Sequence, residues 1–548
     1  MLTDISKQVM WNRLISVVEE QALSLVRSAF STSVREAGDL SAGIFDERGQ
    51  MLAQAVTGTP GHVNSMAEAV PHFIEAIGKD NVFEDDVYIT NDPWRGTGHL
   101  HDITVVSPAF YNGRLVGFLA CTGHVVDIGG RGFGADAREV YEEGLFIPIM
   151  KLRERGTLNR TLIEIVRNNV RESDKVIGDI HALAGCCRTG WLRLRAMFGD
   201  FGIDTLEDIG AFILQNTRAA MLHRLASLPR GIRQNRMTLD GYDRPITLSV
   251  RVAINPDCVV ADFSGTSGPS PYGINVPLCY TKAYASFGLK CALAPEIPNN
   301  SASLAFFRVE APADCILNAQ RPAPVSVRHV LGHFVPELIL GALHELLPDH
   351  IPAEGAGALW NIHCSVRPQA GSGQHGGAEL LMFNSGGMGA RPHLDGLSTT
   401  AFPSGVQTMS TEATENVGPL VVWRKELRPG SGGAGEHRGG LGQVIELGCL
   451  PGYSLQFSAM FDRIHHPARG RDGGADGAPG NVRLDNGTVL RGKGFQAVSE
   501  GARLIIELPG GGGYGQPAKR SRAAVRDDLR NGYISAAQAR DLYKMGAD

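Results

Sequence analysis

Residues 91–130, NDPWRGTGHLHDITVVSPAFYNGRLVGFLACTGHVVDIGG, carry the strongest local folding signal in the chain. Two apolar runs, 103–110 and 115–121, flank Asn112-Gly113. An Asn-Gly pair between β-prone runs is typical of a tight hairpin turn, because both residues tolerate the left-handed backbone conformation that such a turn needs. The stretch therefore predicts a β-hairpin whose two ends lie side by side.

The open end of this hairpin collects imidazole and carboxylate side chains. A two-residue turn places His124 opposite His101, and a three-residue turn places it opposite Asp102. In both registers His99 and Asp127 lie at the same end, although these residues are far apart in sequence. Two imidazoles with one or two carboxylates suit a borderline divalent ion such as Zn, Mn or Fe. The hairpin thus points to one divalent metal ion.

Strand geometry restricts this metal site, because successive side chains point to opposite faces of a sheet. All the candidates can face one centre only if a bulge or a loop redirects one strand end, which Gly96, Gly98 and Gly123 permit. The alternative is that these side chains cap turns or bond to nearby backbone, as His and Asp at strand ends often do. The residue pattern alone leaves both interpretations open.

The composition is that of an ordinary globular protein and excludes several classes of function. With 548 residues, 43% hydrophobic and 20% charged, the chain can form several domains with real cores. A net charge of −5 favours neither nucleic acid nor an anionic membrane as a partner. Nine cysteines without regular spacing indicate reduced thiols. Because no signal peptide and no bilayer-spanning apolar run is visible, we expect a cytoplasmic protein.

The succession of apolar patterns predicts an α+β fold of several subdomains, with mixed helices, antiparallel sheets and many glycine-rich loops. A long amphipathic helix is expected over residues 4–30, with Thr3 or Asp4 as its cap. We expect three domains, which are an N-terminal α+β domain with the metal site (1–230), a central α+β domain (231–418) and a β-rich C-terminal domain with terminal helices (419–548).

Three further residues are candidates for a functional site. Asp39 stands just before an expected strand, where a carboxylate can point into a site, although a turn is its commoner role. His62 lies in a Pro/Gly loop ahead of a helix expected at 66–77 with Ser65 as its cap, and it can be a ligand, a substrate contact or a solvated residue. Glu143 lies in an extended acidic segment.

Two widespread signatures do not occur. The glycine-rich loops are not followed by Lys-Ser or Lys-Thr and do not sit in a strand–loop–helix unit, so we expect no ATP site on this chain. Because no Gly-x-Ser-x-Gly motif is present, a serine hydrolase has no support. The glycine-rich stretches at 371–390 and 430–440 either contact a partner or gate the site.

Eight segments in order resemble the hydantoinase B/oxoprolinase family, the larger catalytic subunits of ATP-dependent hydantoinases, lactamases and related carboxylases. They span nearly the whole chain, from about residue 30 to residue 515. The segments are GDLSAGIFDERGQMLAQA, GTPGHVNSM, NDPWRGTGHLHDITVVSPAF, GHVVDIGG, EEGLFIP, DFSGTSGPSPYGIN, GSGGAGEHRGGLG and PGGGGYGQP.

The resemblance implies a divalent metal at His99, Asp102 and His124, with Asp39 as a fourth ligand. It also implies a second polypeptide, a hydantoinase A-like ATPase subunit of actin-like or sugar-kinase-like fold, which binds the ATP. We therefore expect a hetero-oligomer, and this division of labour explains why a phosphate loop is missing here.

The activity implied by the resemblance is ATP-dependent opening of a cyclic amide such as a hydantoin, a lactam or oxoproline. The ATPase subunit would phosphorylate the oxygen of this small-molecule substrate, and water on the metal would attack the activated carbon. Asp127 is then a candidate for orienting an imidazole. His62 and Glu143 are candidate acids or bases, and for Glu143 a structural ion pair is an equal alternative.

Two other functions remain open at this stage. His101 stands where many family members have Pro, and Asn64 where many have Gly, and the segments 94–98 and 123–130 look closer to the acetone- and acetophenone-carboxylase-like branch. Such a carboxylase would direct the activated substrate onto CO2, so bicarbonate dependence separates it from a hydrolase. In a third interpretation the metal only clips the hairpin shut, and removing a ligand would unfold the chain.

Overall fold

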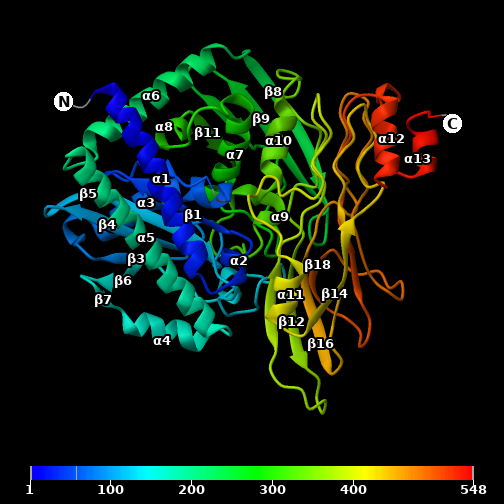
Figure 1. Cartoon of the computed structure of the whole chain (residues 1–548), viewed down its shortest axis with the longest axis horizontal. Coiled ribbons are helices and arrows are strands. Elements are labelled where there is room, and N and C mark those ends of the chain that lie inside the picture. The colour runs from blue at the N-terminus through cyan, green and yellow to red at the C-terminus, as the bar shows by residue number, and fades with distance from the viewer. Residues whose placement is uncertain (1–2, 57–58, 546–548) are drawn as a thin grey trace.

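The computed structural model describes residues 3–56 and 59–545, and its first sheet holds the predicted hairpin in its interior (Figure 1). The strand order is β2-β1-β5-β4-β3-β6-β7, and every neighbouring pair is antiparallel. The strands are β1 Leu40–Phe45, β2 Met51–Gln54, β3 Val87–Thr90, β4 Asp102–Tyr111, β5 Arg114–His124, β6 Met150–Glu154 and β7 Thr157–Leu158.

The hairpin of β4 and β5 turns at the predicted Asn112-Gly113 pair. Both residues have positive φ, 52° and 77°, as the tight turn of a right-twisted hairpin requires. The hairpin prediction is therefore confirmed, with a two-residue turn.

A β-bulge changes the register that this turn alone would produce. The two pairs that flank the bulge are Ala109 with Gly117 and Phe110 with Leu115. The extra residue on β5 moves every later pair by one position, so His124 lies opposite Asp102 instead of His101. Residues directly opposite each other in an antiparallel pair point to the same face. The bulge, at the turn end of the hairpin, thus brings Asp102 and His124 to one side of the sheet.

Helices cover both faces of this sheet. They are α1 Asp4–Ser28, α2 Thr32–Arg35, α3 Pro60–Ile77, α4 Arg160–Asn169, α5 Ser173–Phe201 and α6 Glu207–Ala226, with short 3-10 turns at Lys79–Asn81 and Val140–Glu142. Because successive strand residues alternate between faces, Leu119 and Cys121 of β5 join the core beneath α1 and α5, whereas Phe118 and Ala120 join the core beneath α3. Burial on both faces explains the unbroken apolar run of β5.

Helix α3 begins at Pro60, six residues before the predicted start at Met66. Proline suits the first helical turn, because its missing N–H has no partner there and its φ is already helical. Thr59 occupies the capping position, but its hydroxyl donates to Asp39 instead of accepting a backbone N–H of the helix. His62 therefore lies in the first turn of a helix, and Ser65 does not cap it.

The central part of the chain contains a four-stranded sheet of order β11-β10-β9-β8, in which β10 and β11 are parallel and the other pairs antiparallel. Helix α10 packs on β8 and β9, and α7 packs on α10. The elements are β8 Gly231–Leu239, β9 Ile246–Ile254, β10 Val259–Asp262, β11 Phe307–Glu310, α7 Leu278–Leu293, α8 Ser301–Leu304, a 3-10 turn at Ile316–Asn318, α9 His329–Gly332 and α10 Phe334–Leu343.

The helical segment from His329 to Leu343 is divided into α9 and α10. Pro336 stands in the first turn of α10, where it has no N–H to donate to the carbonyl of Gly332 and its ring crowds that carbonyl. The interruption falls at His333, between the two helices.

Two further antiparallel sheets build the C-terminal part, on the right in Figure 1. Their orders are β13-β12-β16-β18 and β14-β15-β19-β17, and they share one apolar core. The elements are β12 Asn361–Pro368, β13 Ala378–Met382, β14 Leu420–Leu427, β15 Gln443–Cys449, β16 Tyr453–Met460, β17 Asn481–Leu484, β18 Lys493–Ala497, β19 Leu504–Glu507, α11 Thr411–Val417, a 3-10 turn at Pro517–Lys519, α12 Arg522–Arg530 and α13 Ala536–Asp541. The sheet of order β13-β12-β16-β18 combines β12 and β13, which precede the expected domain boundary at residue 418, with β16 and β18, which follow it.

The glycine-rich loops pack backbone against backbone, which accounts for much of the high glycine content. Gly511 donates to the carbonyl of Gly440 at 3.0 Å and accepts from the N–H of Gly433 at 2.8 Å. A Cβ on Gly511 would lie 2.1 Å from the carbonyl oxygen of Met388, so no larger residue fits. These loops are ordered parts of the fold.

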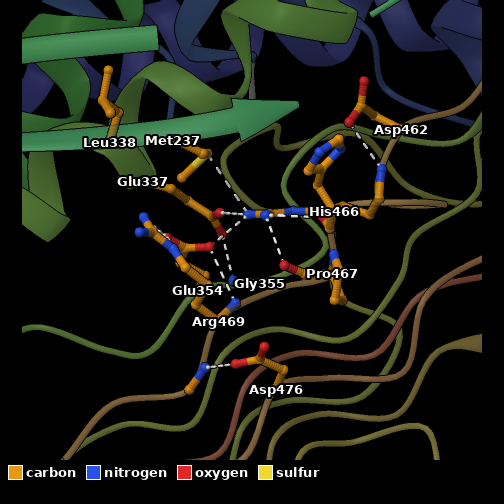
Figure 2. A network of polar contacts seen from close by, with 12 residues as sticks. Met237, Glu337, Leu338, Glu354, Gly355, Asp462, His466, Pro467, Arg469 and Asp476 are labelled. Carbon is orange, nitrogen blue, oxygen red and sulfur yellow. Dashed lines mark hydrogen bonds and ion pairs between the residues drawn. The ribbon is translucent and has the colours of Figure 1, made fainter. Parts of the chain in front are cut away.

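A buried ion network joins α10 to the C-terminal part (Figure 2). The Arg463 side chain is 1% exposed and lies 3.0 Å from Glu337 of α10 and 3.1 Å from Glu354, and Arg469 reaches Glu354 from the solvent side. Figure 2 shows Glu337 and Glu354 converging. Burial raises the pKa of Glu337 to about 7, against the opposing pull of Arg463. Burial also acts on Glu354, but Arg463 and Arg469 outweigh it and lower its pKa.

The predicted α+β class is confirmed, with mostly antiparallel sheets and a strand-rich C-terminal half. No disulfide joins cysteines in the part of the chain that is described. Within residues 3–56 and 59–545, no helix is both long enough and apolar enough to cross a membrane.

Candidate metal centre

The ends of three neighbouring strands lie side by side at one end of the N-terminal sheet and form the candidate site. β5 ends at His124, β4 begins at Asp102, and Asp39 directly precedes β1. The N–H of His124 donates to the carbonyl of Asp39 at 3.2 Å, which extends the β1–β5 hydrogen bonding to this end of the sheet. His99 reaches the same place from the turn before β4, where Gly98 has φ 96°.

His99, Asp102 and His124 each point one ligand atom at a common centre. These atoms all lie within 4.8 Å of one another, and all three residues are buried. His99 Nε2 and Asp102 Oδ1 are 2.8 Å apart, yet neither atom makes a hydrogen bond within the described chain, and neither ring nitrogen of His124 does. Because buried polar atoms rarely lack partners, these converging atoms could hold an ion. The site fits a divalent metal.

The protonation states also suit metal binding, which needs neutral imidazoles and an ionised carboxylate. Burial holds the pKa of His99 below and that of His124 well below the ordinary histidine value. Burial by itself would raise the pKa of Asp102, but His62, His99 and Arg328 outweigh it and hold that pKa well below its usual range.

Surrounding groups fix the orientation of both His99 and Asp102. Asp102 Oδ2 accepts from the Thr97 hydroxyl at 2.8 Å and from Arg328 Nη2 at 2.5 Å, and lies 2.9 Å from His62 Nε2. Asp102 Oδ1 thereby remains available to a ligand. His99 Nδ1 lies 2.8 Å from the Ser326 carbonyl oxygen, and donation there leaves Nε2 with a free lone pair.

Asp39 and His62 lie beside this group. The Asp39 carboxylate accepts from the Thr59 hydroxyl at 2.8 Å and lies 3.6 Å from His62 Nδ1. His62 therefore stands between two carboxylates. Burial would lower its pKa, but Asp102 and Asp39 outweigh burial and raise it. Asp39 lines the same cavity as His124, although it does not belong to the closely spaced group of three.

Asp127 and Glu143 lie at the same end of the sheet but bind backbone groups. Asp127 accepts from the N–H of Gly129 at 3.0 Å and pairs with the Arg171 guanidinium at 3.0 Å. Glu143 Oε1 accepts from the N–H groups of Val325 and Ser326, at 2.6 and 2.7 Å. Because Ser326 contacts His99, Glu143 supports the site through one intermediate residue.

The far wall of the site comes from parts of the chain that sequence reasoning missed. A cavity of about 20 Å³ is bounded on that side by residues from α9, β12 and the loop after β13, namely Arg328, His329, His333, Asn361, Phe383 and Ser404. Phe133 packs against the rings of His99, His101 and His124. The spacing His329-x-x-x-His333 was a visible signal, since two His at i and i+4 share a helix face.

Comparison of the sequence with known protein families identifies the family of this chain. Residues 3–517 match the family described as hydantoinase B/oxoprolinase. The chain belongs to this family.

Some relatives match this chain over nearly their whole length, and solved structures share its fold. An uncharacterized protein of Methanocaldococcus jannaschii is 30% identical over 96% of this chain and 93% of its own. The crystal structure of the ATP-dependent caprolactamase from Pseudomonas jessenii superposes with a TM-score of 0.92 at 27% identity, covering 100% of this chain and 97% of that one. A nucleotide-free acetone carboxylase structure has a TM-score of 0.85 at 18% identity, covering 98% and 79%, which shows a shared fold.

Glu143 makes the stability of the chain depend on pH. Burial raises its pKa from 4.5 to about 8, so between these values the folded chain keeps a proton that the unfolded chain has lost. Stability therefore falls as pH rises from 4.5 to 8, by on the order of 3–5 kcal/mol. Glu143→Gln keeps the acceptor for both N–H groups and cannot ionise, so it should make this fall much smaller and leave only the share of other buried groups such as Glu337.

Urea unfolding at pH 5 and pH 8 measures this difference. Glu142→Gln is the matched control, because Glu142 is partly exposed and pairs with Arg131. An equal loss of stability between the two pH values in the wild type and in Glu143→Gln would show that Glu143 ionises normally. The activity of Glu143→Gln tests whether Glu143 acts as an acid or base, because glutamine cannot exchange a proton in that role.

Proposed function

We propose that this chain is the metal-dependent subunit of an ATP-dependent enzyme that opens a cyclic amide, such as a hydantoin, a lactam or oxoproline. The buried convergence of His99, Asp102 and His124 carries the proposal. Family membership and the full-length likeness to an ATP-dependent caprolactamase support the substrate class.

The chemistry divides between the ion and the residues around it. His99, Asp102 and His124, with Asp39 as a further ligand, would hold a divalent ion, which would act as a Lewis acid and lower the pKa of water. Asp102 remains ionised because His62, His99 and Arg328 outweigh the effect of burial on its pKa. Phe133 keeps bulk water away from the imidazoles.

His62 is the residue best placed to move a proton. Its Nε2 lies 2.9 Å from Asp102 and its Nδ1 3.6 Å from Asp39, and the two carboxylates favour the protonated ring. Opening a cyclic amide requires a proton for the departing ring nitrogen, because an amide anion is a poor leaving group. His62 would supply this proton, and Asp39 and Asp102 would hold the imidazolium in position.

ATP would be used on a second subunit. The caprolactamase relative from Pseudomonas jessenii is a β subunit, 27% identical over 99% of this chain and 96% of its own. We therefore place the phosphorylating step on an ATPase partner of the hydantoinase A type, in a hetero-oligomer with this chain.

The test is cyclic-amide-dependent ATP hydrolysis and ring opening by the assembled subunits, with and without bicarbonate. The proposal predicts a ring-opened amino acid in both conditions. A product that forms only with bicarbonate and contains the bicarbonate carbon would instead identify a carboxylase. Failure of metal-loaded subunits to act on any cyclic amide would contradict the proposal.

A further inference from the structure

The wall opposite the metal ligands contains polar groups that no protein atom satisfies. Asn361 and His329 line the cavity, and each residue is 3% exposed. Asn361 Oδ1 and His329 Nε2 have no hydrogen-bond partner among the described residues. Leaving a buried polar atom without a partner costs about 1–3 kcal/mol, so such atoms call for an explanation.

The position of Asn361 is tightly held, although its side-chain Oδ1 has no partner among the described residues. Asn361 is the first residue of β12 and pairs with Met460 of β16. The preceding residue, Trp360, donates its N–H to the Asn384 carbonyl at 2.9 Å, and its carbonyl accepts from Asn384 Nδ2 at 3.1 Å. The indole N–H of Trp360 also donates to the Asp462 carbonyl at 2.9 Å. This framework presents the Asn361 side chain to the cavity and leaves its Oδ1 for a ligand.

We propose that the Asn361 carboxamide recognises the amide edge of the substrate ring. This inference rests on the proposed function and specifies how the substrate is bound. A ring amide is fixed in the cis form, so its N–H and C=O lie on the same edge. A carboxamide offers one acceptor and two donors in one plane and can therefore form two parallel hydrogen bonds with that edge.

The same side chain suits the activated substrate as well. Transfer of the ATP γ-phosphoryl group to the amide oxygen releases ADP, and the ring N–H proton passes to solvent, so the ring nitrogen becomes an acceptor. The NH2 group of Asn361 then donates to that nitrogen. The cavity shared with His124 places this contact beside the metal ligands.

The cavity has to enlarge before a ring can enter. Its volume of about 20 Å³ is enough for a single water-sized group. Ser404 and Val406 form part of the wall, and the adjacent Gln407 N–H donates to the Ala37 carbonyl at 2.7 Å. Outward movement of this segment breaks one backbone hydrogen bond and leaves Asn361 in place on its sheet.

The test compares lactams with lactones of equal ring size, which differ in having N–H or O in the ring. Calorimetry on the metal-loaded chain, assembled with its ATPase partner and without ATP, measures both affinities. The wild type should bind the lactam at least about 10-fold more tightly, because the site leaves its polar atoms unpaired with a lactone. Asn361→Leu should reduce this preference to about 2-fold or less.

Two further variants keep the test decisive. Asn361→Thr suits a strand and guards against misfolding of the leucine variant, and it should also lose most of the preference. Asn481→Leu, which removes a carboxamide of β17 that is bonded to Glu507 of β19, should leave the preference unchanged. A lactam preference that survives in both Asn361 variants overturns the inference and leaves the proposed function standing. A wild type that binds no lactam of any ring size overturns both.

Discussion

Replacement of Asp102 by Asn should abolish metal binding and destabilise the chain. Asp102 is the only carboxylate in the closely spaced ligand group of the described chain. Its loss removes an anionic ligand, and we expect metal affinity to fall more than about 100-fold, beyond the range seen when supporting residues are changed. The change also leaves the buried Arg328 guanidinium without its partner at 2.5 Å. An unpaired buried charge costs about 3–5 kcal/mol.

Metal titration and urea unfolding of the metal-free protein separate these two effects. Asp39→Asn is the matched control, since it changes a carboxylate in the same cavity that does not touch Arg328. As a peripheral ligand, Asp39 should contribute about 10-fold to metal affinity and little to metal-free stability. Stoichiometric metal at unchanged affinity in Asp102→Asn would contradict the ligand assignment.

The second large effect is expected at Arg463. Arg463→Met leaves Glu337 and Glu354 buried side by side without the cation between them (Figure 2). We expect a loss of about 3–5 kcal/mol in unfolding free energy, because the buried Glu337 then has no cationic partner and lies beside Glu354, which keeps only the half-exposed Arg469. The network ties α10, which follows His333, to the C-terminal part of the fold.

Two comparisons identify the cause of this loss. Arg469→Met removes an ion pair at a half-exposed side chain and should cost no more than about 1 kcal/mol. Combining Arg463→Met with Glu337→Gln and Glu354→Gln removes the stranded charges and should restore much of the stability. If Arg463→Met costs no more than Arg469→Met, the network does not hold the two parts together.

The sequence predicted the candidate group of His99, Asp102 and His124 because these residues lie at the open end of one hairpin marked by Asn112-Gly113. The register was beyond sequence reasoning, since a bulge near Gly117 carries no clear residue signal and moves His124 opposite Asp102. The start of α3 was misplaced because the Thr59 hydroxyl binds Asp39 and gives no capping pattern.

The far wall of the site depends on contacts between distant parts of the chain. Arg328 reaches Asp102 across 226 positions. Asn361 comes from a strand that pairs with β16 and has no motif around it. Such contacts follow from how the sheets pack against one another, which local patterns do not specify.

The central claim is that His99, Asp102 and His124 hold a divalent metal in a folded chain. Metal content of the purified protein, wild type beside His124→Ala, with circular dichroism on both, tests it most directly. We expect about one ion per wild-type chain, as for other buried sites of this ligand type, and its loss from a variant that keeps its fold. A wild-type chain that is folded and supplied with metal yet binds none would contradict the claim, and unfolding of the variant would identify a structural clip instead.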